Sequence, residues 1–243
     1  MKLEAQNLSF AYMPETLALQ DVSFTLGENE ILYVLGRNGS GKTTLLSCLG
    51  GVQKPASGRV LLDGVDIRQC SPTERARRIG LVPQIHVPVF AYTVREMVLM
   101  GRAPHLGLFG SPRHADYAIA DAALESVGLA PLRDRPYTEI SGGERQLVMI
   151  ARGLAQQSRI LLLDEPDAHL DPKNQHLVLE IVVSLARQQG LAFIISSHAP
   201  NNALFYADRV LLLKEGRTLA LGEALETLTA PLLSTAYDME TEV

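Results

Sequence analysis

The residues with the clearest chemical potential in this chain form a glycine-rich stretch near the N-terminus. It fits the phosphate-binding pattern G-x-x-x-x-G-K-[ST] without a mismatch and runs Gly36-Arg37-Asn38-Gly39-Ser40-Gly41-Lys42-Thr43. Glycines let backbone N–H groups turn inward around a β-phosphate, and a following helix adds positive charge at its N-terminus. Lys42 would reach the β- and γ-phosphates, and the Thr43 hydroxyl would bind Mg²⁺. A plain glycine-rich turn is the alternative, and the full match favours a nucleoside triphosphate site.

A second group of candidate residues follows an apolar run of strand length, Ile160 to Leu163. Asp164, at the exit of this run, can hold Mg²⁺ directly or through water. Glu165 beside it can accept a proton from an attacking water, a general-base role worth on the order of 10²–10⁴ in rate. A solvated acidic turn is the alternative, and the phosphate-binding stretch argues against it.

Two further polar side chains also follow apolar runs. His198 comes after Ser196-Ser197, where a side chain can aim at a γ-phosphate. Gln84 comes after a strand-like run and before a helical region, where it could sense Mg²⁺ or water. A lone histidine at a strand end is more often structural. The residue types alone therefore do not decide whether His198 and Gln84 have functional or structural roles.

The phosphate-binding stretch needs a strand before it and a helix after it, and the sequence predicts both. Ile31 to Leu35 is apolar and of strand length, and Thr44 to Leu49 continues as a helix. Val22, Phe24 and Leu26 alternate with polar neighbours, as in a half-buried strand. Further along we predict a strand and hairpin turn at Arg59 to Gly64, a helix from Ser71 to Arg78 and a strand at Ile79 to Val82.

From about His86 to Ala155 the pattern changes to helices alone. Three are expected to begin at Thr93, at Ser111-Pro112 (running to Gly128) and at Ser141, where Glu144 completes a capping box. Strands then resume at Ile160 to Leu163, Leu191 to Ile195 and Val210 to Leu213, with a helix from Asp171-Pro172 to near Gly190. The simplest layout is one α/β domain, residues 1–243. Its mainly parallel core (1–85 and 156–243) carries an antiparallel β part near the N-terminus and a helical subdomain inserted at 86–155.

Composition bounds the possible partners. The chain has 243 residues, 47% of them hydrophobic and 20% charged, and a net charge of −5. This balance gives no electrostatic footprint for nucleic acid, so no nucleic-acid partner is expected. No apolar run approaches the roughly 20 residues of a membrane span, and the N-terminus has no export signal, so we expect a cytosolic chain. Cys48 and Cys70 lie far apart and are expected to be reduced thiols.

One stretch separates this chain from other proteins with a phosphate-binding loop. It runs Ile140-Ser141-Gly142-Gly143-Glu144-Arg145-Gln146 and closely resembles the signature sequence of ATP-binding-cassette (ABC) ATPases. Other positions resemble the same family in order along the chain: Tyr12 its adenine-stacking aromatic, Gln84 its Q-loop glutamine, Leu161 to Pro166 its Walker B strand, Asp171 its D-loop and His198 its switch histidine. The resemblance spans nearly the whole chain.

The resemblance implies an ATPase with a P-loop NTPase core that uses ATP and Mg²⁺. Catalysis would rest on Glu165, His198 and Gln84, and Mg²⁺ would be held by Thr43, Gln84 and Asp164. ATP would be bound by Tyr12, by the stretch from Gly36 to Thr44, by Asp171, and by Ser141, Gly142, Gly143 and Glu144. In ABC ATPases the signature contacts the γ-phosphate held by the other protomer, so a head-to-tail homodimer is expected.

One position departs from the family's pattern. Asp167 stands where ABC ATPases usually have threonine after the Walker B proline. Its negative charge lies close in sequence to the catalytic carboxylates, and we expect it to weaken Mg-ATP affinity or slow turnover without removing a catalytic group.

A last segment indicates the kind of ABC protein. Thr93 to His105 resembles the "VRE…V…GR.PH" segment of importers for iron-siderophores, haem, cobalamin and molybdate. The resemblance implies an importer ATPase, peripheral on the cytoplasmic face of the cell membrane. It would work with permease subunits and, indirectly, with a periplasmic or surface substrate-binding protein. The alternative is a soluble single-cassette ATPase of the cluster-assembly type, and an exporter half is a weaker alternative. The sequence does not identify the cargo.

The surface expected to dock the permease is the segment from Gln84 to His105. Its apolar run, Met97, Val98, Leu99 and Met100, is longer than a one-sided helix requires, and methionines suit a surface that repacks. The alternative is that these four side chains pack inside the helical insertion.

Overall fold

A six-stranded sheet forms the centre of the molecule. The computed structural model describes residues 1–13, 15–84, 90–107, 110–168 and 170–238. The strand order is β10-β9-β3-β8-β7-β6, and every pairing is parallel except that of β10 with β9. The strands are β3 (Ile31–Leu35), β6 (Ile79–Val82), β7 (Ile160–Asp164), β8 (Ala192–Ser197), β9 (Arg209–Lys214) and β10 (Arg217–Glu223). The mainly parallel core is therefore as predicted.

The central strands are buried on both faces, as parallel strands covered by helices must be. Along β3, Ile31, Tyr33 and Leu35 pack in one hydrophobic cluster, and Leu32 and Val34 pack in the other. This alternation follows from the two-residue period of a strand. The sheet therefore separates two cores, one on each face.

A second, antiparallel sheet covers one of these faces. Its order is β2-β1-β4-β5, and its strands are β1 (Leu3–Met13), β2 (Thr16–Leu26), β4 (Ser57–Leu62) and β5 (Val65–Asp66). Val22, Phe24 and Leu26 are all buried along β2, which confirms the predicted alternation. Asp63 and Gly64 join β4 to β5 with φ of 49° and 81°, the backbone of a tight hairpin turn.

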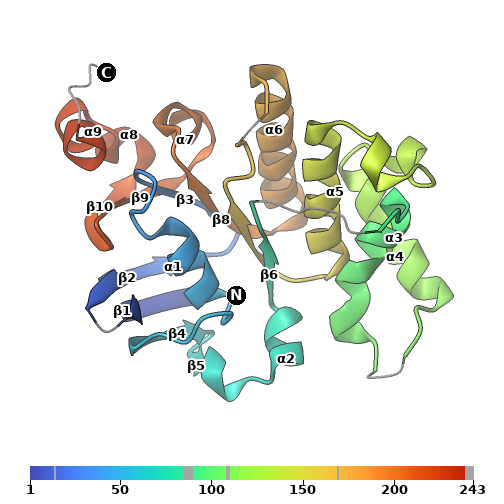
Figure 1. The fold of residues 1–243 in the computed structure, drawn as a ribbon, viewed down its shortest axis with the longest axis horizontal. Coiled ribbons are helices and arrows are strands. Elements are labelled where there is room, and N and C mark those ends of the chain that lie inside the picture. Colours follow the sequence, from blue (N-terminus) through green and yellow to red (C-terminus); the bar gives the residue numbers. More distant parts are fainter. Residues whose placement is uncertain (14, 85–89, 108–109, 169, 239–243) are drawn as a thin grey trace.

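Helix α1 (Lys42–Leu49) lies between the two sheets (Figure 1). Leu45, Leu46 and Leu49 are buried in the same cluster as residues of β1, β2 and β8. The phosphate loop, as we name residues 36–43, is thereby held between β3 and a helix packed on both sides.

Helix α6 (Pro172–Gln189) packs on the opposite face of the six-stranded sheet. It begins and ends as predicted, with Asp171 as N-cap and Gly190 in the left-handed conformation as C-cap. A buried stripe at helical spacing faces the core, formed by Val178, Leu179, Val182, Leu185 and Ala186.

Three helices gather at the β6 end of the sheet (Figure 1): α3 (Val94–Leu99), α4 (His114–Ser126) and α5 (Gly142–Ala155). Thr93 and Ser141 cap α3 and α5 with complete capping boxes, as predicted. The predicted start of the middle helix at Ser111-Pro112 is wrong. Arg113 is the N-cap instead, because its backbone N–H is satisfied by the Asp116 carboxylate at 2.9 Å. The division at residues 86 and 155 stays a prediction, and His86 lies outside the described residues.

Shorter elements complete the described chain. The α-helices are α2 (Pro72–Ala76), α7 (Pro200–Tyr206), α8 (Ala224–Thr227) and α9 (Ala230–Tyr237). The 3₁₀ turns are Ile67–Gln69, Met100–His105, Ala130–Leu132 and Tyr137–Glu139. Across the described ranges, every helix is too short or too polar to cross a membrane.

Candidate nucleotide-binding site

A cleft of about 510 Å³ opens beside the phosphate loop. Its walls come from the β1–β2 hairpin, the loop with the start of α1, and two residues from farther along the chain. The lining residues are Tyr12, Thr16, Leu17, Ala18, Asn38, Gly39, Gly41, Lys42, Thr43, Thr44, Gln84 and Glu165. Most residues predicted to bind ATP from within one chain thus meet at one cleft.

Two glycines set the shape of the phosphate loop. A side chain at Gly36 would place its Cβ 2.4 Å from the Leu213 carbonyl oxygen. Gly41 has a φ of 104°, and a Cβ there would lie 2.6 Å from the Ala18 carbonyl oxygen. The loop therefore curls tightly against its surroundings, and the Lys42 ammonium donates back to the Gly36 carbonyl oxygen at 2.8 Å.

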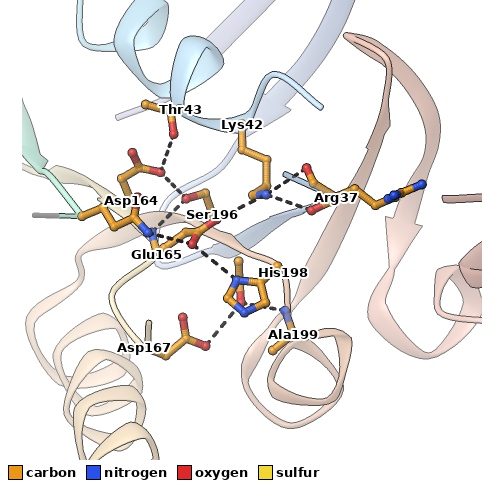
Figure 2. Close-up of polar contacts among 12 residues, drawn as sticks. Arg37, Lys42, Thr43, Asp164, Glu165, Asp167, Ser196, His198 and Ala199 are labelled. Atoms are coloured by element: carbon orange, nitrogen blue, oxygen red, sulfur yellow. Dashed lines mark hydrogen bonds and ion pairs between the residues drawn. The ribbon is translucent and has the colours of Figure 1, made fainter. Parts of the chain in front are cut away.

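Glu165 is the meeting point of the predicted catalytic side chains (Figure 2). Its carboxylate lies 3.3 Å from the Lys42 ammonium and 3.4 Å from Nδ1 of His198, and it accepts a hydrogen bond from the Gln84 side chain at 3.0 Å. The Glu165 backbone has a φ of 45°, which is unusual for a residue other than glycine. Such outliers persist where the surroundings determine them and concentrate at functional sites. The structure thus brings Lys42, Gln84 and His198 together around one carboxylate.

Ser196 organises the neighbouring Asp164. Its hydroxyl donates to Asp164 Oδ1 at 2.6 Å and accepts from the Glu165 backbone N–H at 2.9 Å. Thr43 donates to the same Asp164 oxygen at 3.2 Å (Figure 2). Ser196 therefore fixes both acidic residues at once, a role that the sequence analysis missed. Its position at the end of an apolar run was the available signal.

The residues around Thr43 and Asp164 suit Mg²⁺ by the chemistry of their donors. Mg²⁺ prefers oxygen ligands and usually keeps several waters and phosphate oxygens in its shell. The Thr43 hydroxyl and the Asp164 carboxylate are already adjacent, so one cation can contact both. The described residues hold no group of three or more His, Cys, Asp or Glu that could bind a metal by themselves. A site completed by phosphate oxygens needs no such group.

Tyr12 stands at the mouth of the cleft. Its side chain is 62% exposed, and its hydroxyl lies 3.1 Å from the Thr44 hydroxyl. Phe10 contacts the ring in a T-shaped arrangement, with ring centroids 4.9 Å apart. The ring is therefore supported from one side and remains exposed enough to stack against a flat ligand.

The family follows from comparison with known proteins. A family model described as ABC transporter matches residues 19–168, more than half of the chain. The chain belongs to the ABC transporter family.

Close relatives extend the match to nearly the whole ABC cassette. The molybdate import ATP-binding protein MolC of Haemophilus influenzae is 37% identical over 98% of this chain and 88% of its own length. The hemin import ATP-binding protein HmuV of Myxococcus xanthus is 41% identical over 93% and 86%, respectively. An ABC transporter described as of the metal-chelate type, solved in an inward-facing conformation, aligns with a TM-score of 0.86 at 37% identity. That alignment covers 96% of this chain and 88% of the solved one. The predicted ABC ATPase fold is confirmed.

The ABC signature does not line the cleft of its own chain. Ser141 caps α5, donating through its hydroxyl to the Glu144 carboxylate at 2.7 Å and accepting from the Glu144 N–H at 3.3 Å. Two hydrogen bonds to this carboxylate, from the Ser141 hydroxyl and from the Ser141 backbone N–H, lower the pKa of Glu144. Packing explains why residue 143 is a glycine, because a Cβ at this position would lie only 3.0 Å from the Asn174 side chain.

Asn174 in turn connects the signature to the predicted D-loop. Its side chain donates to Asp171 at 2.6 Å, and its backbone N–H donates to the same carboxylate at 3.0 Å. These hydrogen bonds lower the pKa of Asp171. Asp171 and the signature are therefore joined to each other, and neither reaches the phosphate loop of the same chain's cleft.

The C-terminal helix reaches the phosphate loop, which the sequence analysis did not anticipate. Asp238, directly after α9, accepts from Arg37 at 2.6 Å and from Lys214 at 2.6 Å. Both cations lower the pKa of Asp238. Burial raises the pKa of the neighbouring Tyr237 to about 12, so its hydroxyl stays neutral. The Arg37 side chain is thus paired with Asp238 and is not among the residues that line the cleft.

Proposed function

We propose that this chain is the ATP-binding and ATP-hydrolysing subunit of an ABC importer that energises uptake through a separate permease. The main support for ATP hydrolysis is that Lys42, Gln84 and His198 all contact the Glu165 carboxylate, which lies beside Asp164 and the phosphate loop. The import function is supported by relatives named for hemin and molybdate import. The test is release of phosphate from ATP and Mg²⁺ by the purified chain, followed by uptake assays with the permease.

The proposed surroundings of the chain follow from that role. It would lie on the cytoplasmic face of the cell membrane as a homodimer bound to permease subunits. A periplasmic or surface substrate-binding protein would contribute indirectly. The cargo class is a metal chelate or metal oxyanion, such as an iron-siderophore, haem, cobalamin or molybdate.

The roles of the residues follow from their positions in the cleft. Lys42 and the phosphate loop bind the β- and γ-phosphates, and the Tyr12 ring stacks on the adenine. Thr43, Asp164 and Gln84 hold Mg²⁺, which when bound neutralises phosphate charge. Glu165 accepts the proton of the attacking water, and His198 contacts the γ-phosphate from the adjoining strand end.

ATP binding must rearrange the contacts of Glu165. Lys42 is 5% exposed and is paired with Glu165 in this structure. The triphosphate offers Lys42 a more highly charged partner, so the ammonium moves from carboxylate to phosphate. Glu165 loses one counter-charge in that step, which leaves it a freer acceptor for a water proton. The same exchange couples nucleotide binding to activation of the base.

The second wall of the ATP site comes from another copy of this chain. Ser141 and Gly142 are exposed at the positively polarised N-terminus of α5, a 14-residue helix, and lie outside their own cleft. Such a helix end suits an anion. In a head-to-tail pair each signature would face the γ-phosphate bound by its partner.

We therefore expect ATP to close the homodimer. The Glu165→Gln variant should sediment as a dimer with ATP and as a monomer with ADP. Adding Ser141→Glu places a negative charge against the partner's phosphate and should weaken dimerisation at least about tenfold, a change of about 1.4 kcal/mol. Ser71→Glu is the matched control, because Ser71 caps α2 with the same capping box. Equal dimerisation by both serine variants would exclude the signature from the interface.

The permease-docking surface needs a correction. Met97, Val98 and Leu99 are buried, at 1%, 0% and 8% exposure, so the expectation that they form a docking surface is wrong. They pack between α4 and α5. Met100 is 39% exposed and Phe90 is 63% exposed, and these two remain available for docking within the described part of the segment. Residues 85–89 of the predicted segment lie outside the described residues.

Met100→Glu is accordingly expected to uncouple uptake from ATP hydrolysis. A charge at this exposed apolar position should lower recovery with permease-containing membranes and lower uptake, while ATPase activity of the free chain stays within about twofold, because surface changes of this kind cost little stability. Leu225→Glu is the control, since Leu225 is 80% exposed on α8. Wild-type uptake by Met100→Glu would place the docking surface elsewhere.

A further inference from the structure

Asp167 is a buried carboxylate next to the candidate site. It lies three residues after Asp164, in the turn that follows β7, and is 3% exposed. A buried carboxylate is costly unless hydrogen bonds compensate it. One of its oxygens, Oδ2, accepts from the Asn202 side chain at 2.6 Å and from the Ser197 hydroxyl at 3.3 Å. The charge of Asp167 is therefore directed at these two residues.

The two partners of Asp167 lie on either side of His198 in the chain. Ser197 precedes His198 directly, and its hydroxyl also accepts from the Ala199 backbone N–H at 3.1 Å. Asn202 lies in α7, the helix that begins two residues after His198. One carboxylate oxygen thus holds the side chain before His198, which itself binds the peptide after His198, and a side chain of the helix that follows.

Within the part of the chain that the structure describes, Glu165 is the only polar partner of the His198 side chain. This side chain is 55% exposed, and its contact with Glu165, at 3.4 Å, is longer than a good hydrogen bond. Figure 2 shows Asp167 beside His198 and Ala199, while Lys42 and Thr43 lie on the far side of Glu165. The direction of the imidazole is therefore set mainly by the backbone that Asp167 holds.

We propose that Asp167 is a positioning residue for ATP hydrolysis, which holds the chain on both sides of His198 and so aims its imidazole at Glu165 and the phosphate site. This inference rests on the proposed function. It differs from the expectation that the charge of Asp167 acts on Mg-ATP directly, since a positioning role predicts an effect on turnover more than on ATP affinity.

A second buried polar group, the Tyr33 hydroxyl, is close enough to Asp167 to be influenced by its charge. Tyr33 is fully buried on β3, and its hydroxyl, like Oδ1 of Asp167, has no hydrogen-bond partner within the described residues. Burial, and after it the charge of Asp167, raises the pKa of Tyr33 well above its usual value. Tyr33 is therefore a neutral phenol beside this carboxylate, and among the described residues the donors to Asp167 are Ser197 and Asn202.

The geometry provides a conservative variant for the test. Both donors converge on Oδ2, so an asparagine can place its amide oxygen there and keep both hydrogen bonds. Asp167→Asn should therefore retain near wild-type turnover. Asp167→Ala removes the acceptor and should lower kcat by about 10- to 100-fold, the size expected when a reacting group is misplaced by about 1 Å. The KM for ATP should change less than about threefold, because Asp167 touches no residue of the phosphate loop in the described structure.

A double-mutant cycle with His198→Ala tests whether Asp167 acts through His198. Single-turnover phosphate release is measured for wild type, Asp167→Ala, His198→Ala and the double variant. If Asp167 acts by aiming His198, Asp167→Ala has almost no further effect once the imidazole is absent. A loss of kcat in the His198→Ala background as large as in wild type would overturn the proposal, and so would wild-type kcat in folded Asp167→Ala.

Asn202→Ala provides a second route should Asp167→Ala fail to fold, because Asn202 is only half-buried. It removes the stronger hydrogen bond to Asp167 and should lower kcat in the same direction, with the same dependence on His198. An independent effect of Asn202→Ala in the His198→Ala background would contradict the inference. A wild-type chain that releases no phosphate would refute the proposed function, and this inference with it. An active wild type with additive effects would refute the inference alone.

Discussion

Replacing Glu165 with glutamine should remove most steady-state ATP hydrolysis and leave ATP binding intact. Glutamine keeps the shape of the side chain and cannot accept a proton, so the general-base contribution is lost, on the order of 10²–10⁴ in rate. The structure adds an expectation about affinity. Glu165 pairs with Lys42 before nucleotide binds, and glutamine competes less well for that ammonium. ATP should therefore bind the variant at least as tightly as wild type.

Phosphate release and calorimetry with ATP measure the two parts separately. Glu226→Gln is a matched control, because Glu226 is an exposed glutamate on α8, away from the cleft. It should leave both quantities unchanged. Steady-state phosphate release by Glu165→Gln equal to that of wild type would show that another group is the base.

The parts of the fold that the sequence predicted correctly are determined by local rules. The phosphate loop, the strand before it and the helix from Asp171 to Gly190 depend on glycine backbone freedom, caps and hydrophobic period, all of which act over a few residues. The Ser111-Pro112 error has the same origin. Serine and proline are both favoured at helix starts, which is why the helix was predicted to begin there. The Asp116 carboxylate instead accepts from the Arg113 N–H, and this hydrogen bond places the start of α4 after Arg113.

Contacts between segments far apart in the sequence could not be predicted from local sequence rules. Met97 illustrates this, because α3 has only six residues and lies between α4 and α5, so neighbours cover more than one of its faces. The apolar run from Met97 to Met100 was interpreted as a docking surface, with packing inside the insertion as the alternative, and its local pattern is compatible with both. Only the packing of the three helices separates Met97, which is buried, from Met100, which is exposed.

The candidate site combines both kinds of information. Motifs predicted that Lys42, Gln84, Glu165 and His198 belong together, and the sheet order then explains why they meet, since β3, β8, β7 and β6 are adjacent and parallel. The carboxyl ends of these strands lie along one edge of the sheet. The link through Asp238 has no motif and depends on tertiary structure alone, and the link through Ser196 had only its position at a strand end as a signal.

Lys42→Ala is expected to weaken ATP binding as well as turnover. Loss of a charge-assisted contact costs about 1.5–3 kcal/mol, or roughly 10- to 150-fold in affinity. The structure indicates why the loss should not be larger. Lys42 is already paired with Glu165, so part of its attraction to phosphate is spent on breaking that pair. In the Glu165→Gln background this competition is weaker, and the same lysine replacement should cost more ATP affinity than it does in wild type.

Calorimetric titration of ATP into four proteins, wild type, each single variant and the double variant, measures this difference directly. Lys54→Ala controls for loss of a positive charge, because Lys54 is exposed and lies outside the cleft. Unchanged ATP affinity in Lys42→Ala would refute the phosphate-binding role. An equal loss in both backgrounds would mean that the Lys42–Glu165 pair does not compete with nucleotide. If Lys42 must leave Glu165 to bind phosphate, its contribution to the free energy of ATP binding has to change when the Glu165 carboxylate is replaced.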